Sequence, residues 1–525
     1  MPSIRPWFSL IRALWVLLRE GVITALPDEG APPPIVTLKR IARFVERKRA
    51  SNQAQSTVLS RALNRLGPSW VKLGQFLATR PDIVGKSIAL DLELLQDRMD
   101  PFSQEEARER VERTLFAPLE ELYSQFGRPV AAASVAQVHK AIVQDDDGTE
   151  HSVAVKVIRP GIRARFAHDL KTFYTAAHAL ERFFPATRRL RLIDSVDMLA
   201  ASAKLEMDLR LEAAGFSEMA QNIRNDEGFR LPDIDWARSG RDCLTMDWVD
   251  GIKMNDLTAL RASHHDLPTL ANRINQAFLH HALRDGFFHA DMHPGNLFVA
   301  PDGDIVAVDL GISGRIGKPE KRFLAEILYG FITRDYRRVA EVHFEAGYVP
   351  AHKDVASFAQ ALRAVGEPIH GQPADKVSMA SLLSLLFEVT ELFEMKTQPQ
   401  LLLLQKTMVV VEGVARSLDP HFNMWTSAEP IVTDYVRKQI GPIGVMSDLN
   451  EGARAAGRLV RMAPEFARRL ETLSEEIDTM AKNGVRLDQP TIEAIGKAEA
   501  RHSRSGRVAL WIIAAAAVAG VWTLF

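Results

Sequence analysis

The stretch HADMHPGNLFVAPDGDIVAVDLG, from His289 to Gly311, is the part of the sequence that decides the fold. Two short apolar runs, NLFVA and IVAVDLG, flank the turn sequence PDGD, and this pattern predicts a β-hairpin. Asp291 and Asn296 lie just before the hairpin, and Asp309 ends its second strand. The order HxDxxxxN, hairpin, DxG therefore predicts one polar site built from these three side chains.

Phosphoryl transfer from ATP requires a carboxylate that orients or deprotonates the acceptor hydroxyl, and oxygen ligands that hold Mg²⁺ on the phosphates. We expect Asp291 to be the catalytic residue, with Asn296 and Asp309 as the metal ligands. Each piece also has a plainer interpretation, in which HPGN is an ordinary turn and Asp309 caps a strand. All three in this order favour the phosphotransfer site.

His289 and His293, four residues apart, raise the alternative of a zinc site. Pro294 and Gly295 predict a loop there, and a catalytic zinc ion would need a third ligand that the sequence does not supply. Zinc is therefore the weaker interpretation.

Lys156 lies in VAVKVI, within the second of two alternating stretches, SVAQVHKAIVQ and EHSVAVKVIRP, which the loop DDDGT joins. The alternation predicts antiparallel strands. A lysine on the inward face of such a strand needs an anion, either a phosphate or a carboxylate. In AKLEMDLRLEAAGF, taken as one helix, Asp208 and Glu212 share a face and Glu206 points away. The residues alone do not choose the partner of Lys156.

The stretch AAASVAQVHK stands where a glycine-rich phosphate loop is expected, yet it contains no glycine. Glycine lets backbone amides close on phosphates, and each alanine adds a methyl group to that approach. We therefore expect a stiffer, more restrictive nucleotide loop. Beside Lys156, the expected ATP contacts are Ala131, Ala132, Ala133, Ser134, Val135, Ala136, Gln137 and Val138.

These motifs, together with KLGQ at Lys72 to Gln75, resemble the UbiB family of atypical kinase-like proteins of ubiquinone biosynthesis. The kinase motifs alone are shared with aminoglycoside phosphotransferases, whereas KxGQ and the alanine loop are specific. The resemblance implies that Glu212 pairs with Lys156, while Glu206 and Asp208 meet the KxGQ helix. It also implies an occluded cleft that binds ATP (or ADP) with Mg²⁺, and action at the membrane on polyprenyl quinone precursors, with other ubiquinone-biosynthesis proteins as further partners.

The expected fold class is α+β: a bilobal, protein-kinase-like fold with a small antiparallel sheet in one lobe and a helical second lobe. The predicted parts are an N-terminal interfacial helix and linker at 1–34, a helical extension carrying KxGQ at 35–125, an N-lobe with a family insert at 126–253, a helical C-lobe at 254–440, an amphipathic helical region at 441–506 and a transmembrane helix at 507–525.

Residues 508–525 are uncharged and almost wholly apolar, which predicts a single membrane span rather than a buried core helix. Arginines precede the span, so we expect the kinase-like part on the cytoplasmic side of a bacterial inner membrane, or at the mitochondrial inner membrane if the source is eukaryotic. Small residues in the span would permit a homodimer. Residues 7–26 predict a helix that lies on a membrane surface, with packing on the folded body equally open and a mitochondrial targeting segment as a further alternative.

Composition narrows the function further. The chain has 525 residues, 65 basic and 66 acidic, for a net charge of −1, so no charge excess indicates nucleic acid. Cys243 is the single cysteine, which excludes an internal disulfide framework. Beyond Asp309 the sequence turns helical within a few residues, without a peptide-binding platform, which disfavours protein kinase activity. An ATPase is expected, with a lipid or small-molecule kinase and a nucleotide-binding pseudokinase scaffold as alternatives.

Overall fold

A computed structural model describes residues 5–22, 56–78, 80–84, 88, 91–92, 99–145, 147–183, 185–371, 385, 388–390, 392–395 and 399–439. Contacts divide the chain into residues 1–440 and 441–525, and every described residue lies in the first unit. The predicted amphipathic region at 441–506 and the predicted span at 507–525 therefore lie outside the described residues. Within the described part, none of the helices has the length and apolarity needed to cross a membrane.

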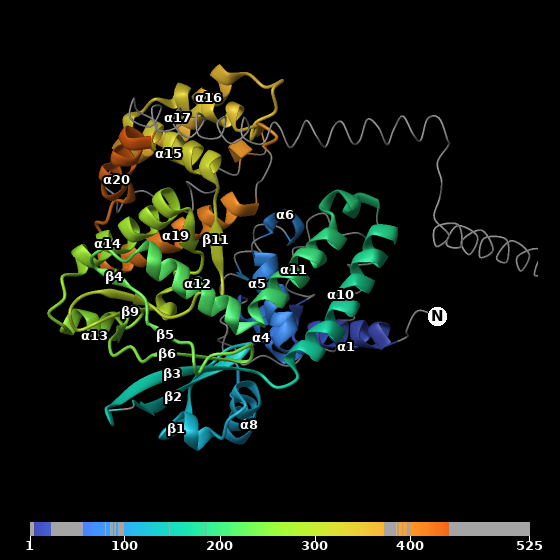
Figure 1. The fold of residues 1–525 in the computed structure, drawn as a ribbon. Helices are drawn as coiled ribbons and strands as arrows, with labels where there is room; N and C mark the ends of the chain where they lie inside the picture. Colours follow the sequence, from blue (N-terminus) through green and yellow to red (C-terminus); the bar gives the residue numbers. More distant parts are fainter. Residues whose placement is uncertain are drawn as a thin grey trace, which may run out of the picture. The chain divides into compact units, whose positions relative to one another are not determined.

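A five-stranded antiparallel sheet forms the first half of the region expected to be kinase-like (Figure 1). Its strand order is β1-β2-β3-β6-β5, and the predicted β2–β3 hairpin is confirmed, with Gln144 opposite Glu150. The strands are β1 (Gln125–Ala132), β2 (Ala136–Gln144), β3 (Glu150–Ile158), β5 (Ile234–Asp235) and β6 (Cys243–Asp247).

Strand β1 was not predicted. It is an edge strand, its outward and inward residues do not alternate in burial, and it contains Gly127 and Pro129. A two-residue hydrophobic period arises only where one face of a strand is buried and the other is not. The sequence therefore lacks the signal that identified β2 and β3.

The two faces of this sheet have different environments, because successive side chains on a strand point to opposite sides. Val153, Val155 and Val157 of β3 are buried in a cluster with Ala107 and Val111 of helix α8 (Gln104–Leu115). A capping box at Ser103 begins α8. The other face of β3 carries Ala154 and Lys156, so the valines fix the sheet on α8 and the lysine lies on the opposite face.

The described residues of the N-terminal extension, and those of the family insert, are mainly helical. Helix α5, which carries the KxGQ residues, contacts α10 and α11, and α1 packs against α10 and α4. The helices are α1 (Arg5–Arg19), α4 (Ser56–Leu66), α5 (Pro68–Ala78), α6 (Pro81–Val84), α9 (Leu119–Leu122), α10 (Ile162–Phe183), α11 (Leu192–Glu206) and α12 (Leu209–Asn222).

The single helix expected for AKLEMDLRLEAAGF is wrong, because the structure has two helices there. Helix α11 ends at Glu206 and α12 begins at Leu209. Asp208 is the N-cap of α12, and its side chain accepts a hydrogen bond from the Arg210 amide. An aspartate satisfies a free amide at a helix start, so the same residue that seemed to continue one helix begins the next.

The second half of this region, as far as it is described, is mainly helical around short strands. The predicted hairpin after Asn296 is confirmed, with Val299 of β9 opposite Ile305 of β10. The strand orders are β4-β10-β9-β7 and β11-β8. The elements are β4 (Phe229–Arg230), β7 (Ile252–Lys253), α13 (Leu257–Ala262), α14 (Leu267–Leu279), a π-helical segment (His280–Asp285), β8 (Phe287–His289), β9 (Leu297–Val299), β10 (Ile305–Ala307), β11 (Ser313–Arg315), α15 (Lys318–Thr333), α16 (Tyr336–Glu345), α17 (Val355–Gly371), α19 (Pro399–Leu418) and α20 (Met424–Gln439).

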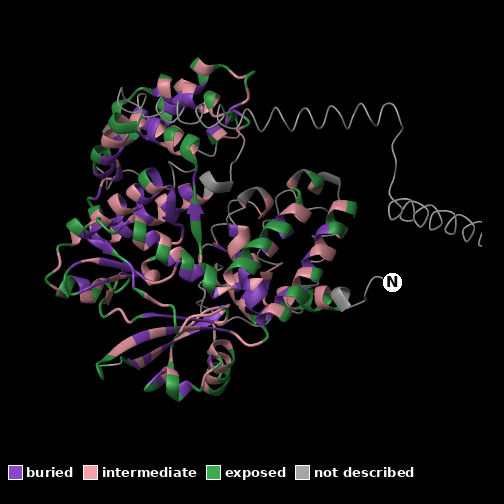
Figure 2. Cartoon of the chain, in the orientation of Figure 1, coloured by how far each residue is buried: buried purple, intermediate pink, exposed green. Residues whose placement is uncertain are grey.

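One large hydrophobic core joins α12, α14, α19, α20 and the short strands (Figure 2). Helix α14 packs against both α19 and α20, so residues far apart in sequence share this core. The core reaches β3 through Ile158 and β6 through Leu244. Lys156 and the loop at His289 are therefore positioned by one continuous packed interior.

Substitution of Phe216 on α12 tests how much this core stabilises the helix that carries Glu212. The Phe216 side chain is 1% exposed. We expect Phe216→Ala to lower the free energy of unfolding by about 3–5 kcal/mol, because the phenyl ring is lost and a cavity remains. Urea unfolding of the purified protein measures this change.

Leu211→Ala on the same helix is the matched control, because Leu211 is 50% exposed. We expect the control to change stability by no more than about 0.5 kcal/mol. Equal effects of the two substitutions would show that the core does not anchor α12.

Candidate active site

Lys156 meets two carboxylates from distant parts of the chain. Its Nζ atom lies 2.7 Å from Glu212 Oε1 and 3.2 Å from Asp309 Oδ2. Glu212 comes from the first turn of α12, and Asp309 follows β10. The structure thus places Glu212, rather than Glu206 or Asp208, against the lysine, and brings Asp309 to the same ammonium group.

The charges in this cluster shift one another's pKa values. Burial raises the pKa of Glu212 to about 7, although Lys156 opposes this rise. Burial alone would lower the pKa of Lys156, but Asp309 and Glu212 raise it above its ordinary value. Burial alone would also raise the pKa of Asp309, but Lys156 and the Gly311 amide hold it below its usual value. Lys156 is therefore a permanent cation, and Asp309 is the carboxyl that stays ionised beside it.

The loop after β8 holds Asp291 and Asn296 together. Asn296 Nδ2 donates to Asp291 Oδ2 and to the Asp291 carbonyl oxygen, both at 3.1 Å. The Asp291 amide donates to Nδ1 of His289 at 3.2 Å, and burial lowers the pKa of that histidine. His293 accepts a hydrogen bond from the Gly295 amide and so begins the short turn that delivers Asn296. Both histidines have structural contacts in this loop.

Asn296 and Asp309 are brought together by the hairpin between them. The Val308 amide donates to the Asn296 carbonyl oxygen at 3.0 Å, so the residue before Asp309 is bonded to Asn296. The Asn296 amide nitrogen is turned toward Asp291, which leaves its side-chain oxygen available. The Asp309 side chain is 42% exposed although it is ion-paired. An amide oxygen and a partly exposed carboxylate suit Mg²⁺, so these residues fit the metal expected from the motifs.

The alanine loop is tied down along its backbone. The Arg159 guanidinium donates to the Ala133 carbonyl oxygen at 2.9 Å and to that of Asp100 at 2.8 Å. The Arg159 amide donates to the Val135 carbonyl at 2.8 Å, and the Met99 amide to the Ala132 carbonyl at 3.2 Å. A loop with its carbonyl groups bonded in this way has little freedom to close over a ligand. No pattern in the sequence distinguishes Arg159 from an ordinary surface arginine.

The predicted ATP contacts divide between the two faces of β2. Val138 pairs directly with Lys156 and shares its face. Gln137 points to the opposite face, where it is buried and bonded to both backbone groups of Phe102. The Gln137 side chain is therefore directed away from Lys156. The remaining predicted contacts form the end of β1, the turn and the start of β2.

The KxGQ helix α5 contacts α11 through apolar side chains and through an ion pair. Lys72 Nζ lies 2.6 Å from Glu206 Oε1, and both side chains are largely buried. Asp208, which the resemblance also directed to this helix, instead binds Arg210 and caps α12. Gln75 is half-buried on α5, and its side chain has no hydrogen-bond partner among the described residues. The expected contact therefore holds for Glu206 and is wrong for Asp208.

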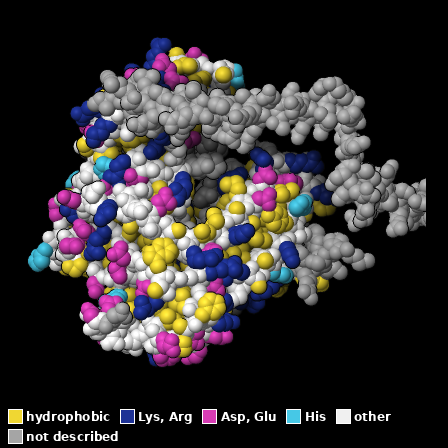
Figure 3. Space-filling model, in the orientation of Figure 1, with side chains coloured by type: hydrophobic (Ala, Val, Ile, Leu, Met, Phe, Trp, Pro, Cys, Tyr) yellow, Lys and Arg dark blue, Asp and Glu magenta, His cyan; other side chains and the backbone are white. Residues whose placement is uncertain are grey.

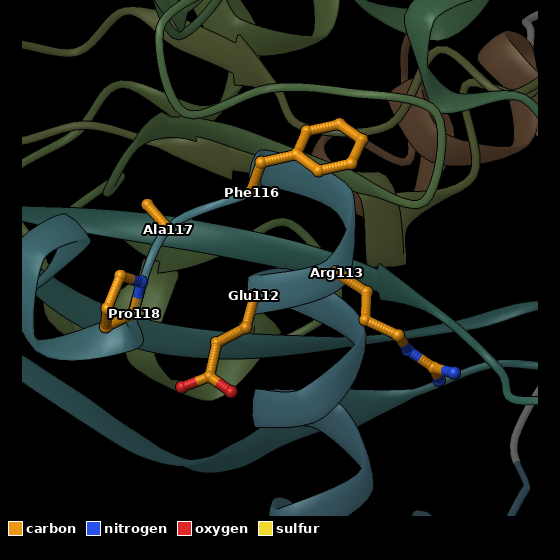
Figure 4. Close-up of a pocket in the computed structure, with 5 residues that line it drawn as sticks. All are labelled: Glu112, Arg113, Phe116, Ala117 and Pro118. Atoms are coloured by element: carbon orange, nitrogen blue, oxygen red, sulfur yellow. The ribbon is translucent and has the colours of Figure 1, made fainter.

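A surface hollow lies elsewhere, at the junction of α8 and α9 (Figure 4). Its walls are Glu112, Arg113, Phe116, Ala117 and Pro118, and the Phe116 ring stands exposed at its rim. None of the predicted site residues lines this hollow. The chemistry of the Lys156 cluster, rather than the shape of this surface, identifies the candidate active site.

Comparisons with known proteins agree with this geometry. Residues 94–343 match the model of the ABC1 atypical kinase-like domain, and residues 362–423 match the UbiB helical domain. A protein of Marinobacter nauticus named probable protein kinase UbiB is 38% identical over 448 residues, covering 84% of this chain and 80% of the relative. A protein of the same name from Aeromonas hydrophila is 35% identical, covering 98% of this chain and 93% of the relative.

A solved structure, that of Rv3197 from Mycobacterium tuberculosis in complex with erythromycin, shares the fold with a TM-score of 0.51. The two sequences are 22% identical, and the match covers 71% of this chain and 96% of the Rv3197 chain. The likeness supports the kinase-like α+β architecture predicted from the sequence.

The raised pKa of Glu212 predicts a specific pH dependence of stability. Folding shifts this pKa from an ordinary value of 4.5 to about 7, so the folded state binds more protons than the unfolded state between these values. Ionisation of Glu212 therefore lowers the stability of the folded state as the pH rises through this window. We expect the stability of Glu212→Gln relative to that of the parent protein to be higher at pH 7.5 than at pH 5. Urea unfolding at the two pH values measures this change.

Glu218→Gln, on the same helix, is the control. A hydrogen bond from Arg315 holds the pKa of Glu218 below its ordinary value, so its contribution is lost only at more acidic pH. The difference between this variant and the parent should be constant across the window. A constant difference for Glu212→Gln as well would contradict the raised pKa.

Proposed function

The chain belongs to the UbiB family of kinase-like proteins, and we propose that it binds ATP with Mg²⁺ and hydrolyses it in the service of ubiquinone biosynthesis at a membrane. The observation that carries this proposal is the contact of Lys156 with both Glu212 and Asp309. A lysine held between a helix glutamate and an aspartate after a strand is the arrangement that positions the phosphates of ATP in kinases.

Each residue of the cluster has a definite role in this proposal. Lys156 binds phosphate oxygens, and Glu212 keeps the ammonium group in place. Asn296 and Asp309 would hold Mg²⁺, which would neutralise charge on the phosphates. Asp291, restrained by Asn296, orients the attacking hydroxyl group, which in hydrolysis is that of water.

Hydrolysis is favoured over phosphorylation of proteins by the segment that follows Asp309. Strand β11 pairs with β8 immediately after it, and α15 begins at Lys318. This short connection leaves little chain to bind a peptide substrate. The alanine loop also favours hydrolysis over phosphorylation of proteins. Its carbonyl groups are bonded to Arg159 and Met99, so the loop is not free to move with a substrate.

Two other functions are compatible with the same cluster. A lipid kinase would transfer the phosphoryl group to a hydroxyl of a polyprenyl quinone precursor, and a scaffold would bind nucleotide only to organise other ubiquinone-biosynthesis proteins. A scaffold requires neither the contact of Asn296 with Asp291 nor that of Lys156 with Asp309, so this geometry favours an enzyme.

The membrane part of the proposal rests on helix α1. Its outward stripe combines Phe8, Ile11 and Trp15, which are 65%, 64% and 50% exposed, with exposed Arg12 and Arg19. The opposite side of α1 packs on α10, so this helix belongs to the folded body and still presents an apolar, basic face. Hydrophobic side chains also gather over the neighbouring helices, with Lys and Arg at their border (Figure 3). Such a face suits the surface of an anionic bilayer.

The fate of the terminal phosphate of ATP tests the enzymatic proposal. We expect the protein in lipid, given Mg²⁺ and ATP labelled at that phosphate, to release label as free phosphate. Asp309→Asn should abolish this release and the Mg²⁺ dependence of nucleotide binding, because the metal loses its carboxylate. Label in an added quinone precursor would instead establish a lipid kinase, and nucleotide binding without any transfer would establish a scaffold.

A fluorophore on α1 tests the membrane surface. Cys243 is fully buried and burial raises the pKa of its thiol to about 12, so an introduced cysteine is the reactive one. We expect an environment-sensitive dye on Ile11→Cys to shift its emission to the blue when phosphatidylcholine vesicles containing phosphatidylglycerol are added. The same dye on Phe116→Cys, a 93% exposed site on another face, is the control. Equal responses at the two sites would contradict docking through α1.

A further inference from the structure

The peptide group between Ala290 and Asp291 has a hydrogen-bond partner at each end. Its N–H group, which belongs to Asp291, donates to His289 Nδ1 at 3.2 Å. Its carbonyl oxygen, which belongs to Ala290, lies 3.0 Å from the hydroxyl oxygen of Thr407. This peptide group immediately precedes the Cα atom of Asp291. The orientation of its plane therefore sets the direction in which the Asp291 side chain leaves the backbone.

Thr407 reaches this loop from the far end of the sequence. It lies on α19, 117 residues beyond Ala290, and it is fully buried. Helix α19 packs against α14 in the main core and also contacts β11, which follows Asp309. A β-branched side chain on a packed helix has few accessible rotamers, so the hydroxyl is held at this position.

The Thr407 hydroxyl has a second acceptor within reach, the Leu403 carbonyl oxygen at 2.8 Å. A hydroxyl has only one proton to donate, and the two oxygens therefore share it. Leu403 O is also the acceptor of the ordinary helical bond from the Thr407 amide. The Ala290 oxygen has no other hydrogen-bond donor among the described residues, and Ala290 is 5% exposed. A buried carbonyl group without a donor is unfavourable. Loss of the Thr407 bond to Ala290 is therefore more costly than loss of its bond to Leu403.

We infer that Thr407 is a positioning residue for Asp291, acting through the Ala290 carbonyl group. The inference rests on the proposed function, because Asp291 must take part in turnover for its position to matter. Three contacts then hold Asp291: Thr407 and His289 fix the plane of the preceding peptide group, and Asn296 fixes the carboxylate. The helical segment that carries Thr407 is thereby part of the catalytic machinery rather than an appended support.

The test compares Thr407→Val with Thr407→Ser. Valine keeps the shape of threonine and removes the hydroxyl group, whereas serine keeps the hydroxyl group. We expect Thr407→Val to lower kcat for ATP hydrolysis by about tenfold or more, because displacement of a catalytic group by an ångström is sufficient for a loss of this size. The Kd for Mg²⁺-ATP should stay within about twofold of the parent value, because Lys156 and Asp309 are untouched. Thr407→Ser should restore most of kcat.

Thr172→Val is the matched control, since Thr172 is also fully buried but lies on α10, and its hydroxyl has no partner among the described residues. It should leave kcat unchanged. Hydrogen–deuterium exchange supplies a second measurement that does not depend on turnover. The segment at 287–296 should exchange faster in Thr407→Val than in the parent and in Thr407→Ser.

The outcomes separate the two proposals. A parent protein that hydrolyses ATP, with Thr407→Val equal to it in kcat and in exchange, overturns the positioning role alone. A parent protein without hydrolysis overturns the proposed ATPase, and the exchange of the 287–296 segment then decides whether Thr407 orders the loop.

Discussion

The charge of Lys156 is the constraint on which the rest of this structure depends. An ammonium group on the largely buried side of a sheet requires anions, and here they come from α12 and from the end of β10. Glu212 lies in the first turn of α12, a helix that Asp208 caps just after α11 ends at Glu206. Asp309 can reach the lysine only because β9 and β10 form a hairpin. One charge thus ties together the sheet, helix α12 and the end of the β9–β10 hairpin.

The same constraint makes the cluster responsive to a ligand. Two carboxylates share one cation, and burial leaves Glu212 with a pKa near 7 while Asp309 stays ionised. A metal ion on Asp309, or a phosphate on Lys156, would change the charge that the other members meet. Nucleotide binding would therefore change the electrostatic environment of Glu212 in the first turn of α12, which lies four residues from the cap at Asp208 and six from Glu206, the partner of Lys72 on the KxGQ helix.

The structure changes the interpretation of the alanine loop. Its methyl groups alone suggested a restrictive cover for the phosphates, whereas the structure adds that Arg159 and Met99 bind its carbonyl groups. Restriction therefore arises from the backbone contacts as well as from the side chains. Arg159 directly follows β3, the strand that carries Lys156, so the loop and the lysine are held by the same piece of chain.

The sequence by itself determined the elements with strong local patterns and which residues are expected to form the candidate site. Alternation predicted β2 and β3, turn residues predicted the β9–β10 hairpin, and the order of Asp291, Asn296 and Asp309 predicted a phosphotransfer cluster. Edge strand β1 and the break at Asp208 were missed, because neither produces a hydrophobic period. The residues alone left the partner of Lys156 open, the family resemblance implied Glu212, and the structure shows that contact. Only the tertiary structure decided which face Gln137 occupies and that Thr407 contacts the loop that carries Asp291. These contacts join residues far apart in the chain, and their geometry depends on how the shared core packs, which no local pattern encodes.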